Sequence, residues 1–183
     1  MRAPKNQIQR LKIQRNPQLQ PVLLLILLLQ ISGGVTSPFE FGNKFYASRN
    51  GKITKLGCKM PVPGNYRVSL WNFTTTDLIT ATTIITTDST QFQYNDISAV
   101  EITANTRYVI SFNNTISSVP KRYFLYYKYP LGLTSIYPFT IGSITFETLQ
   151  EKASAVSVFP DVVNPSDQTV LGGVPDMQFE YTE

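Results

Sequence analysis

The chain has 183 residues, a length typical of one domain, with 16 Lys and Arg against 12 Asp and Glu. It contains no histidine, which excludes Ser-His-Asp and Cys-His catalytic arrangements and the usual zinc sites. It contains one cysteine, so no disulfide can form within the chain.

The first 34 residues are predicted to be a secretory signal peptide. Five basic residues and no acidic residue precede an apolar run at residues 22–29. As a helix this run would span roughly 12 Å, too short for a hydrocarbon core of roughly 30 Å. Ser32, Gly33 and Gly34 follow as small residues that suit cleavage after Gly34. An uncleaved membrane anchor is the alternative interpretation.

Removal of this leader changes the charge of the protein. Eleven Lys and Arg then remain against twelve Asp and Glu, all at or after Glu40. Residues 35–183 are therefore nearly neutral, and the basic leader is no sign of nucleic acid binding. We expect a secreted or cell-surface protein with no nucleic-acid partner, which touches a membrane only through an uncleaved leader.

After the leader, the sequence is dominated by strands with one apolar face. Along the segment that begins at Tyr66 every second residue is apolar: Tyr66, Val68 and Leu70. No helix-length apolar stripe occurs. Such segments cover residues 53–60, 66–73, 78–87, 91–97 and 107–112. The predicted fold is all-β: an antiparallel β-sandwich, jelly-roll or immunoglobulin-like, of about eight to ten strands in a single domain over residues 35–183.

Local signals refine this prediction. The apolar phase changes between Ile53 and Leu56, which indicates a bulge. Cys58 lies at two-residue spacing between Leu56 and Met60 and is predicted to be a buried thiol. Residues 74–77 are predicted to close a hairpin, and Asn105 suits a left-handed turn position.

The last third of the sequence is less regular. Residues 130–175 are rich in proline, and we expect long ordered loops around two or three short strands, with apolar runs at 141–146 and 155–159. Met177, Phe179 and Tyr181 then alternate with polar residues and predict a closing strand.

Several motifs occur in a characteristic order along the strands. They are Gly42-Asn43-Lys44-Phe45, Leu70-Trp71, Leu78-Ile79-Thr80-Ala81-Thr82 and Ala104-Asn105-Thr106-Arg107-Tyr108-Val109-Ile110-Ser111. In this order, residues 41–112 and the last strand resemble an uncharacterised family of secreted bacterial β-sandwich domains, a domain of unknown function. Phe92 and Asn105 depart from the Trp and Gly of its pattern. The family occurs beside immunoglobulin-like, adhesive and glycan-active modules, so the resemblance implies carbohydrate binding and carries over no catalytic residue.

The strand at residues 123–129 is the best candidate for a binding surface. One of its faces carries Arg122, Phe124, Tyr126 and Lys128, and we predict that this face is exposed because charges flank the aromatic pair. Aromatic rings pack on the C–H face of a sugar, and Arg or Lys donates to its hydroxyls. The alternative is that loops from residues 130–175 cover this face.

Trp71 is the fifth candidate ligand-binding residue. It lies opposite the apolar face of its strand, where it is either buried under a loop or exposed. Asp161, Asn164 and Asp167 offer oxygen ligands for calcium, but they lack the closely spaced carboxylates of a strong site. No metal or cofactor is therefore predicted. Glycosylation sequons begin at Asn72 and Asn113.

The predicted function is that of an exported, non-catalytic module that binds carbohydrate or is adhesive at the cell surface. Its partner would be a glycan or a cell-surface protein. A structural or protein-assembly module of an extracellular complex is the alternative. An enzyme ranks third, because the chain has neither a histidine nor an interpretable pair of carboxylates. Some glycosidases use only carboxylates, so this class is weakened and not excluded.

Overall fold

The structure, a computed structural model, describes residues 20–21, 28–32, 37–117, 119–128, 135–172 and 175–181. All of its paired strands are antiparallel. The elements are β1 (Gln20–Pro21), β2 (Leu28–Ser32), β3 (Phe39–Ala47), β4 (Gly51–Cys58), β5 (Gly64–Asn72), β6 (Leu78–Thr86), β7 (Gln93–Ile102), β8 (Arg107–Asn113), β9 (Thr115–Ile116), β10 (Val119–Pro120), β11 (Phe124–Lys128), β12 (Phe139–Ile141), β13 (Ile144–Ala153), the 3-10 helix η1 (Pro165–Thr169), β14 (Val170–Gly172) and β15 (Pro175–Tyr181).

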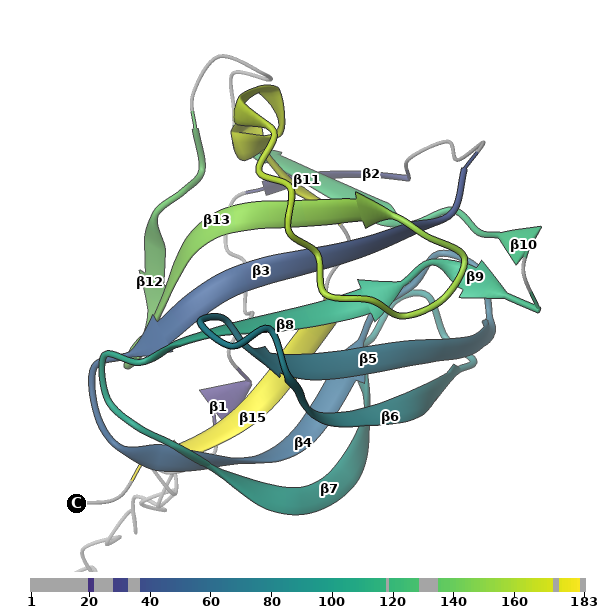
Figure 1. Cartoon of the computed structure of the whole chain (residues 1–183). Helices are drawn as coiled ribbons and strands as arrows, with labels where there is room; N and C mark the ends of the chain where they lie inside the picture. Colours follow the sequence, from purple (N-terminus) through teal and green to yellow (C-terminus); the bar gives the residue numbers. More distant parts are fainter. Residues whose placement is uncertain are drawn as a thin grey trace, which may run out of the picture.

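Two main sheets form the predicted β-sandwich. A six-stranded sheet has the order β12-β13-β3-β8-β5-β6, and a four-stranded sheet has the order β1-β15-β4-β7. Figure 1 shows the four-stranded sheet behind and below the six-stranded one. A three-stranded sheet, β14-β11-β2, and the small β10-β9 pair complete the fold. We call the side of the six-stranded sheet that is turned away from the four-stranded sheet its outer face.

The core lies between the main sheets and follows the period of two. Tyr66, Val68 and Leu70 of β5 are fully buried, and Tyr108, Ile110 and Phe112 of β8 are buried beside them. The four-stranded sheet adds fully buried side chains of its own, among them Ile53, Leu56, Cys58 and Met177. Burial of this apolar surface is the main stabilising contribution to the fold.

The local predictions for the strands are confirmed. The register of β4 shifts between Ile53 and Lys55, at the expected bulge. The β5–β6 hairpin is present, and Asn105 has a φ of 61° in the left-handed region. The closing strand β15 pairs with β4 and buries Met177 and Phe179.

The prediction for residues 130–175 is wrong in part. β13 is a ten-residue strand next to β3 inside the six-stranded sheet, and not a short one. Its register shifts between Phe146 and Thr148, and this irregularity breaks the alternation that would mark a long strand. Residues 155–159 form no strand, because they lie across the outer face of the sheet and not along its edge.

Part of the predicted leader falls on described residues. Leu28–Ser32 form β2, which pairs with β11. The rest of the predicted leader, apart from Gln20 and Pro21, lies outside the described residues. In the described ranges, no helix is long and apolar enough to cross a membrane.

Candidate functional site

A loop covers part of the outer face of the six-stranded sheet. This covering loop, residues 154–164, follows β13 and passes over β3 towards β8 (Figure 1). Asn113 holds its first part, because its Nδ2 donates to the carbonyls of Ser154 (3.2 Å) and Val156 (3.1 Å). Its later part is tied to β13 by reciprocal backbone hydrogen bonds between Glu151 and Val162 of 2.9 and 3.1 Å.

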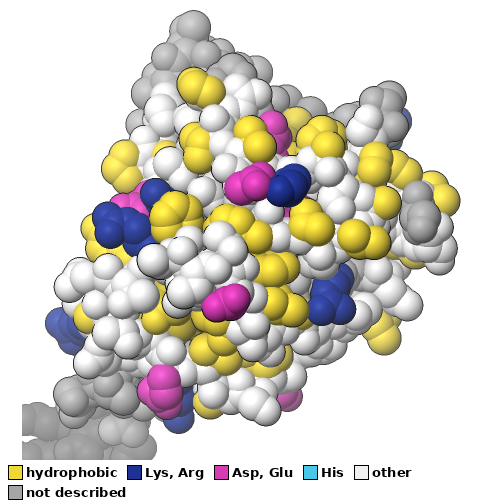
Figure 2. Space-filling view, in the orientation of Figure 1, with side chains coloured by type: hydrophobic (Ala, Val, Ile, Leu, Met, Phe, Trp, Pro, Cys, Tyr) yellow, Lys and Arg dark blue, Asp and Glu magenta, His cyan; other side chains and the backbone are white. Residues whose placement is uncertain are grey.

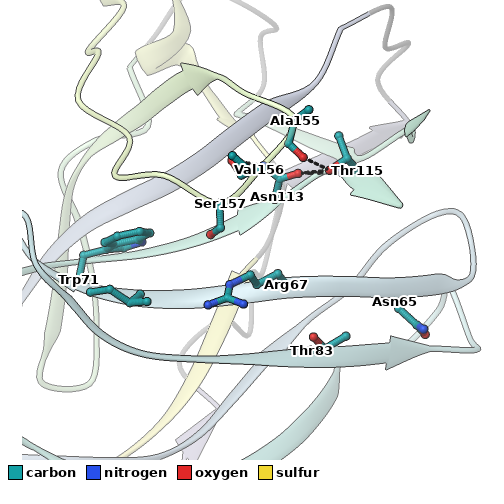
Figure 3. Close-up of a pocket in the computed structure, with 10 residues that line it drawn as sticks. Asn65, Arg67, Trp71, Thr83, Asn113, Thr115, Ala155, Val156 and Ser157 are labelled. Carbon is teal, nitrogen blue, oxygen red and sulfur yellow. Dashed lines mark hydrogen bonds between the residues drawn. The ribbon is translucent and has the colours of Figure 1, made fainter. Parts of the chain in front are cut away.

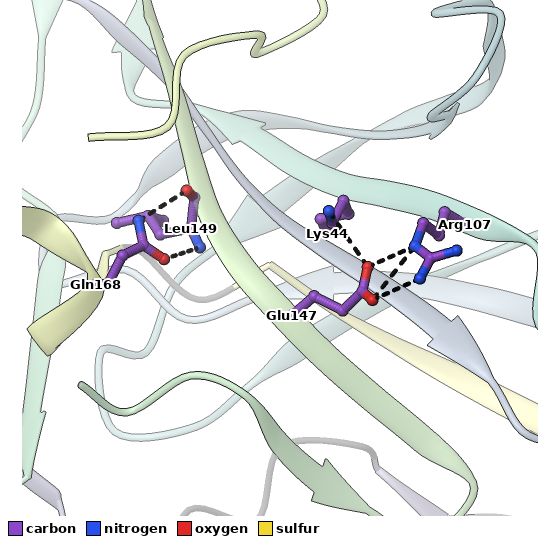
Figure 4. Close-up of polar contacts among 5 residues, drawn as sticks. All are labelled: Lys44, Arg107, Glu147, Leu149 and Gln168. Atoms are coloured by element: carbon purple, nitrogen blue, oxygen red, sulfur yellow. Dashed lines mark hydrogen bonds and ion pairs between the residues drawn. The ribbon is translucent and has the colours of Figure 1, made fainter. Parts of the chain in front are cut away.

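The end of the covering loop is also held. Gln168 of η1 donates to the carbonyl of Leu149 at 3.2 Å and accepts from the Leu149 amide at 3.0 Å (Figure 4). It also donates to the carbonyl of Asn164 at 3.1 Å. A side-chain amide here fills the place of a strand partner along β13. The loop is thus fixed at both ends by buried or half-buried amides.

Close packing explains how the loop lies so near the sheet. A Cβ at Gly42 would come within 2.7 Å of Val109 Cγ1 and 2.8 Å of Pro160 Cγ, so only glycine leaves room for this approach. Phe159 meets the ring of Trp71 edge-on, with centroids 6.0 Å apart. Val109, although on the outer face, is therefore fully buried.

A chain of hydrogen bonds, here called the Glu40 network, lies beneath the loop. Trp71 Nε1 donates to Ser111 Oγ at 2.7 Å, and Ser111 Oγ donates to Glu40 Oε1 at 2.5 Å. Ser157 of the loop also donates to Glu40 Oε1, at 3.3 Å, and lies 3.0 Å from Ser69 Oγ. Glu40, Ser69 and Ser111 are fully buried. The second carboxyl oxygen, Oε2, has no hydrogen-bond partner among the described residues.

Burial controls the ionisation of Glu40. It raises the pKa of this carboxyl from 4.5 to about 7, although Ser111, Asn113, Ser157 and the charge of Arg67 all favour the ionised form. The carboxyl therefore changes its charge near neutral pH, beneath the loop.

A pocket of about 420 Å³ opens beside the network, at the small end of the range for small-molecule sites. Its floor comes from the β5–β6 hairpin and its wall from β8, β9 and the covering loop (Figure 3). The lining residues are Asn65, Arg67, Trp71, Leu78, Thr83, Asn113, Thr115, Ala155, Val156 and Ser157. We call it the outer-face pocket.

The polar groups of the hairpin lie on one face of it. Arg67 and Thr83 are direct cross-strand partners, and Asn65 lies two residues along β5 on the same side. Figure 3 shows the Arg67 guanidinium reaching along β5 towards Trp71. Figure 2 shows that hydrophobic side chains gather across the middle of this side of the molecule, with charges scattered among them. The pocket therefore offers a cation, an amide and hydroxyls within a partly apolar surround.

The prediction that the β11 face is exposed is wrong for the side chain of Phe124. This side chain is only 7% exposed and belongs to the core, with Lys59 Nζ 5.3 Å from its ring centroid. It is covered because its side of β11 packs into the hydrophobic core cluster and is not turned to solvent. Arg122 is exposed, just before the strand. The side chains of Tyr126 and Lys128 lie outside the described part of the structure.

Trp71 is the predicted candidate that lines the pocket, and the structure does not bring it together with the other four candidates, which lie on β11, a strand of another sheet, or just before it. It is 6% exposed, buried under the loop as one of the two expectations had it. Arg67, Ser157 and Glu40 were not predicted as site residues. Arg67 could have been found as a cation on the polar face of a strand, whereas nothing local marks Glu40 as buried.

Other charged or polar side chains that could mark a site are already paired or buried within the structure. Glu147 accepts from Arg107 Nε at 2.9 Å and pairs with Lys44 at 3.3 Å, so this charged cluster satisfies itself (Figure 4). Asp161 of the predicted calcium set pairs with Lys152 at 2.7 Å, and the side chain of Asp167 lies outside the described part. In the described residues, no three His, Cys, Asp or Glu side chains group as metal ligands. Asn113 is buried, which closes its sequon to modification in the folded protein.

Comparison with known proteins places residues 30–138 within a family model. That model is described as Domain of unknown function (DUF4082). No curated protein matches the chain. The matched range contains β5, β6 and β8, which carry most of the pocket, and it ends before the covering loop.

Proposed function

The chain belongs to the DUF4082 family, a domain of unknown function, and we propose from its structure that it is an exported, non-catalytic module that binds carbohydrate. Its binding site is the outer-face pocket and not the β11 surface. The partner is a glycan at or outside the cell surface, and the module acts as a binding or adhesive unit.

One observation carries this proposal: the pocket combines a guanidinium, an amide and hydroxyls from neighbouring strands within a surface that is partly apolar. Sugars present many hydroxyls and apolar C–H patches, and sites of this mixed kind recognise them. Leu78, which is 44% exposed and is the register partner of Trp71, supplies an apolar patch of the pocket lining. The wall is ready before any ligand arrives, because Asn113 and Gln168 hold the covering loop.

A glycan array tests the proposal, followed by titration of whichever glycan binds. Arg67→Ala should weaken binding at least about tenfold, the effect of losing one charge-assisted contact. Arg122→Ala is the matched control, because it removes an exposed arginine from the β11 surface. Loss of binding in the control alone would show that the binding site lies at β11. An array without any bound glycan would overturn the proposal.

Export is part of the proposal and rests on the leader. Cleavage after Gly34 would remove β2 from the edge of β11. N-terminal sequencing of protein from its native host should then begin at Val35. Intact Met1 on a membrane-embedded product would show an uncleaved anchor instead.

A protein-assembly module is the second candidate, favoured by apolar side chains at one edge of the sandwich. β6 is the last strand of the six-stranded sheet, and Leu78, Ile79 and Ile85 on it are exposed. An edge strand of this kind can pair with another chain, although Asn95 of β7 already donates to the Thr83 carbonyl at 2.7 Å. Light scattering of the purified protein tests self-association, which Ile85→Lys should abolish.

A further inference from the structure

Arg67 differs from the other cations on the outer face because no acid neutralises it directly. Lys44 and Arg107 share Glu147, and Lys152 pairs with Asp161. The Arg67 guanidinium, in contrast, has no carboxylate within 4.0 Å among the described residues and donates no hydrogen bond to them. It is exposed and lines the pocket. Its planar fork of N–H donors is therefore open to a ligand.

A guanidinium selects for carboxylate more strongly than for hydroxyl groups. It binds a carboxylate through two parallel hydrogen bonds, and a charged pair of this kind is roughly twice as strong as a neutral one. Thr83, directly across from Arg67, and Asn65 on the same face of β5 are placed to meet hydroxyls on the same ligand.

We propose that the ligand of the outer-face pocket is an acidic sugar, whose carboxylate is held by Arg67 while Asn65 and Thr83 bind its hydroxyls. This inference rests on the proposed function and deepens it, because it names the class of glycan. A uronic acid or a sialic acid carries the required group.

The Glu40 network adds a dependence on pH. Glu40 is faced by Ser111 and Asn113 from β8, by Ser157 from the loop and by Arg67 from β5, and Lys152 is its register partner on β13. An ionised Glu40 repels a bound carboxylate and competes for the field of Arg67. Since burial raises the pKa of Glu40 to about 7, this opposition falls away as the pH drops through that value.

The sugar carboxylate itself stays ionised through this range, because carboxyl groups of that kind titrate at about pH 3.5. Affinity for the acidic sugar should therefore rise by about 3- to 10-fold between about pH 8 and about pH 5.5, with screening by salt setting the lower figure. A neutral sugar should show no such rise.

The test compares two oligosaccharides that differ only at C6 of each sugar residue: an oligomer of galacturonic acid and the galactose oligomer of the same linkage and length. A sialoside and its asialo counterpart form a second pair. Calorimetric titration of the full chain at both pH values measures each affinity, with Arg67→Ala, Arg67→Lys and Glu40→Gln as variants.

We expect the acidic member of at least one pair to bind at least about tenfold more tightly than its neutral counterpart. Arg67→Ala should remove this preference, Arg67→Lys should keep part of it, and Glu40→Gln should keep it without the pH dependence. Equal binding of both members would overturn the inference and leave the proposed function standing. A failure of all four probes overturns the inference, and an array without bound glycan overturns the proposed function as well.

Discussion

Ser157 donates a hydrogen bond to Glu40 across 3.3 Å, and the two residues are 117 positions apart in the sequence. This contact joins the covering loop to β3 at a carboxyl that is fully buried. The ionisation of Glu40, the position of the loop and the wall of the pocket are therefore linked. Single substitutions can test each part of this link.

Glu40→Gln should change how stability depends on pH. The pKa of Glu40 is raised from 4.5 to about 7 in the folded state, so its contribution is present below about pH 4.5 and is lost as the pH rises through about 7. That loss is about 3 kcal/mol, at about 1.4 kcal/mol for each pKa unit. The variant, which carries no charge, should be more stable than the parent at about pH 8 and similar at about pH 4.5, as measured by urea unfolding.

Glu147→Gln is the control with the opposite sign. Burial of Glu147 is outweighed by the hydrogen bond from Arg107 and the charge of Lys44, so the pKa of Glu147 lies below its ordinary value. Its contribution is present above pH 4.5 and is lost as the pH falls, so this variant should be least stable relative to the parent at neutral pH. A Glu40→Gln variant with the same pH profile as Glu147→Gln would contradict the burial of Glu40.

Asn113→Ala should release the covering loop. The change removes the two hydrogen bonds to the carbonyls of Ser154 and Val156, which should cost about 1–3 kcal/mol of unfolding free energy. Hydrogen exchange should become faster at the amides of residues 154–164, and glycan binding should weaken because the pocket loses its wall.

Asn72→Ala is the matched control for this change. Asn72 accepts from the amides of Thr74 and Thr75 in the β5–β6 turn, so its loss should affect that turn and not the loop. Unchanged exchange in the covering loop of the Asn113→Ala protein would show that Asn113 is not its anchor.

Phe124→Ala should lower the free energy of unfolding by about 3–5 kcal/mol, because the ring is 7% exposed and part of the core. Arg122→Ala, two residues earlier and exposed, should change it by less than about 0.5 kcal/mol. Thermal or urea unfolding of the two variants measures the difference. If Phe124→Ala were neutral for stability and lost glycan binding, the β11 surface would be the ligand site after all.

Cys58 should be inert in the folded protein. It is fully buried, and burial raises the pKa of its thiol from 9.0 to about 12, so almost no thiolate forms at neutral pH. Ellman's reagent should react with it only after denaturant is added, and should then titrate one thiol per chain. Rapid reaction in native buffer would show that β4 opens readily.

The sequence by itself determined the buried face of the central strands. The period of two in β5 and β8 assigns Tyr66, Val68 and Leu70, and then Tyr108, Ile110 and Phe112, to one buried face, and the structure confirms it. The bulge in β4 and the left-handed conformation of Asn105 could also be predicted, because the apolar phase and the turn preference depend only on neighbouring residues.

Only the tertiary structure decided what lies on the second face of each strand. Alternation says that Phe124 and Glu40 lie on particular faces of their strands, but not which segment of the chain covers those faces. Phe124 became core because its side of β11 packs into the hydrophobic cluster, and Glu40 became buried because the loop after β13 crosses β3. Burial of a strand's second face depends on contacts between residues far apart in sequence, such as Asn113 with Ser154, and no periodicity encodes these contacts.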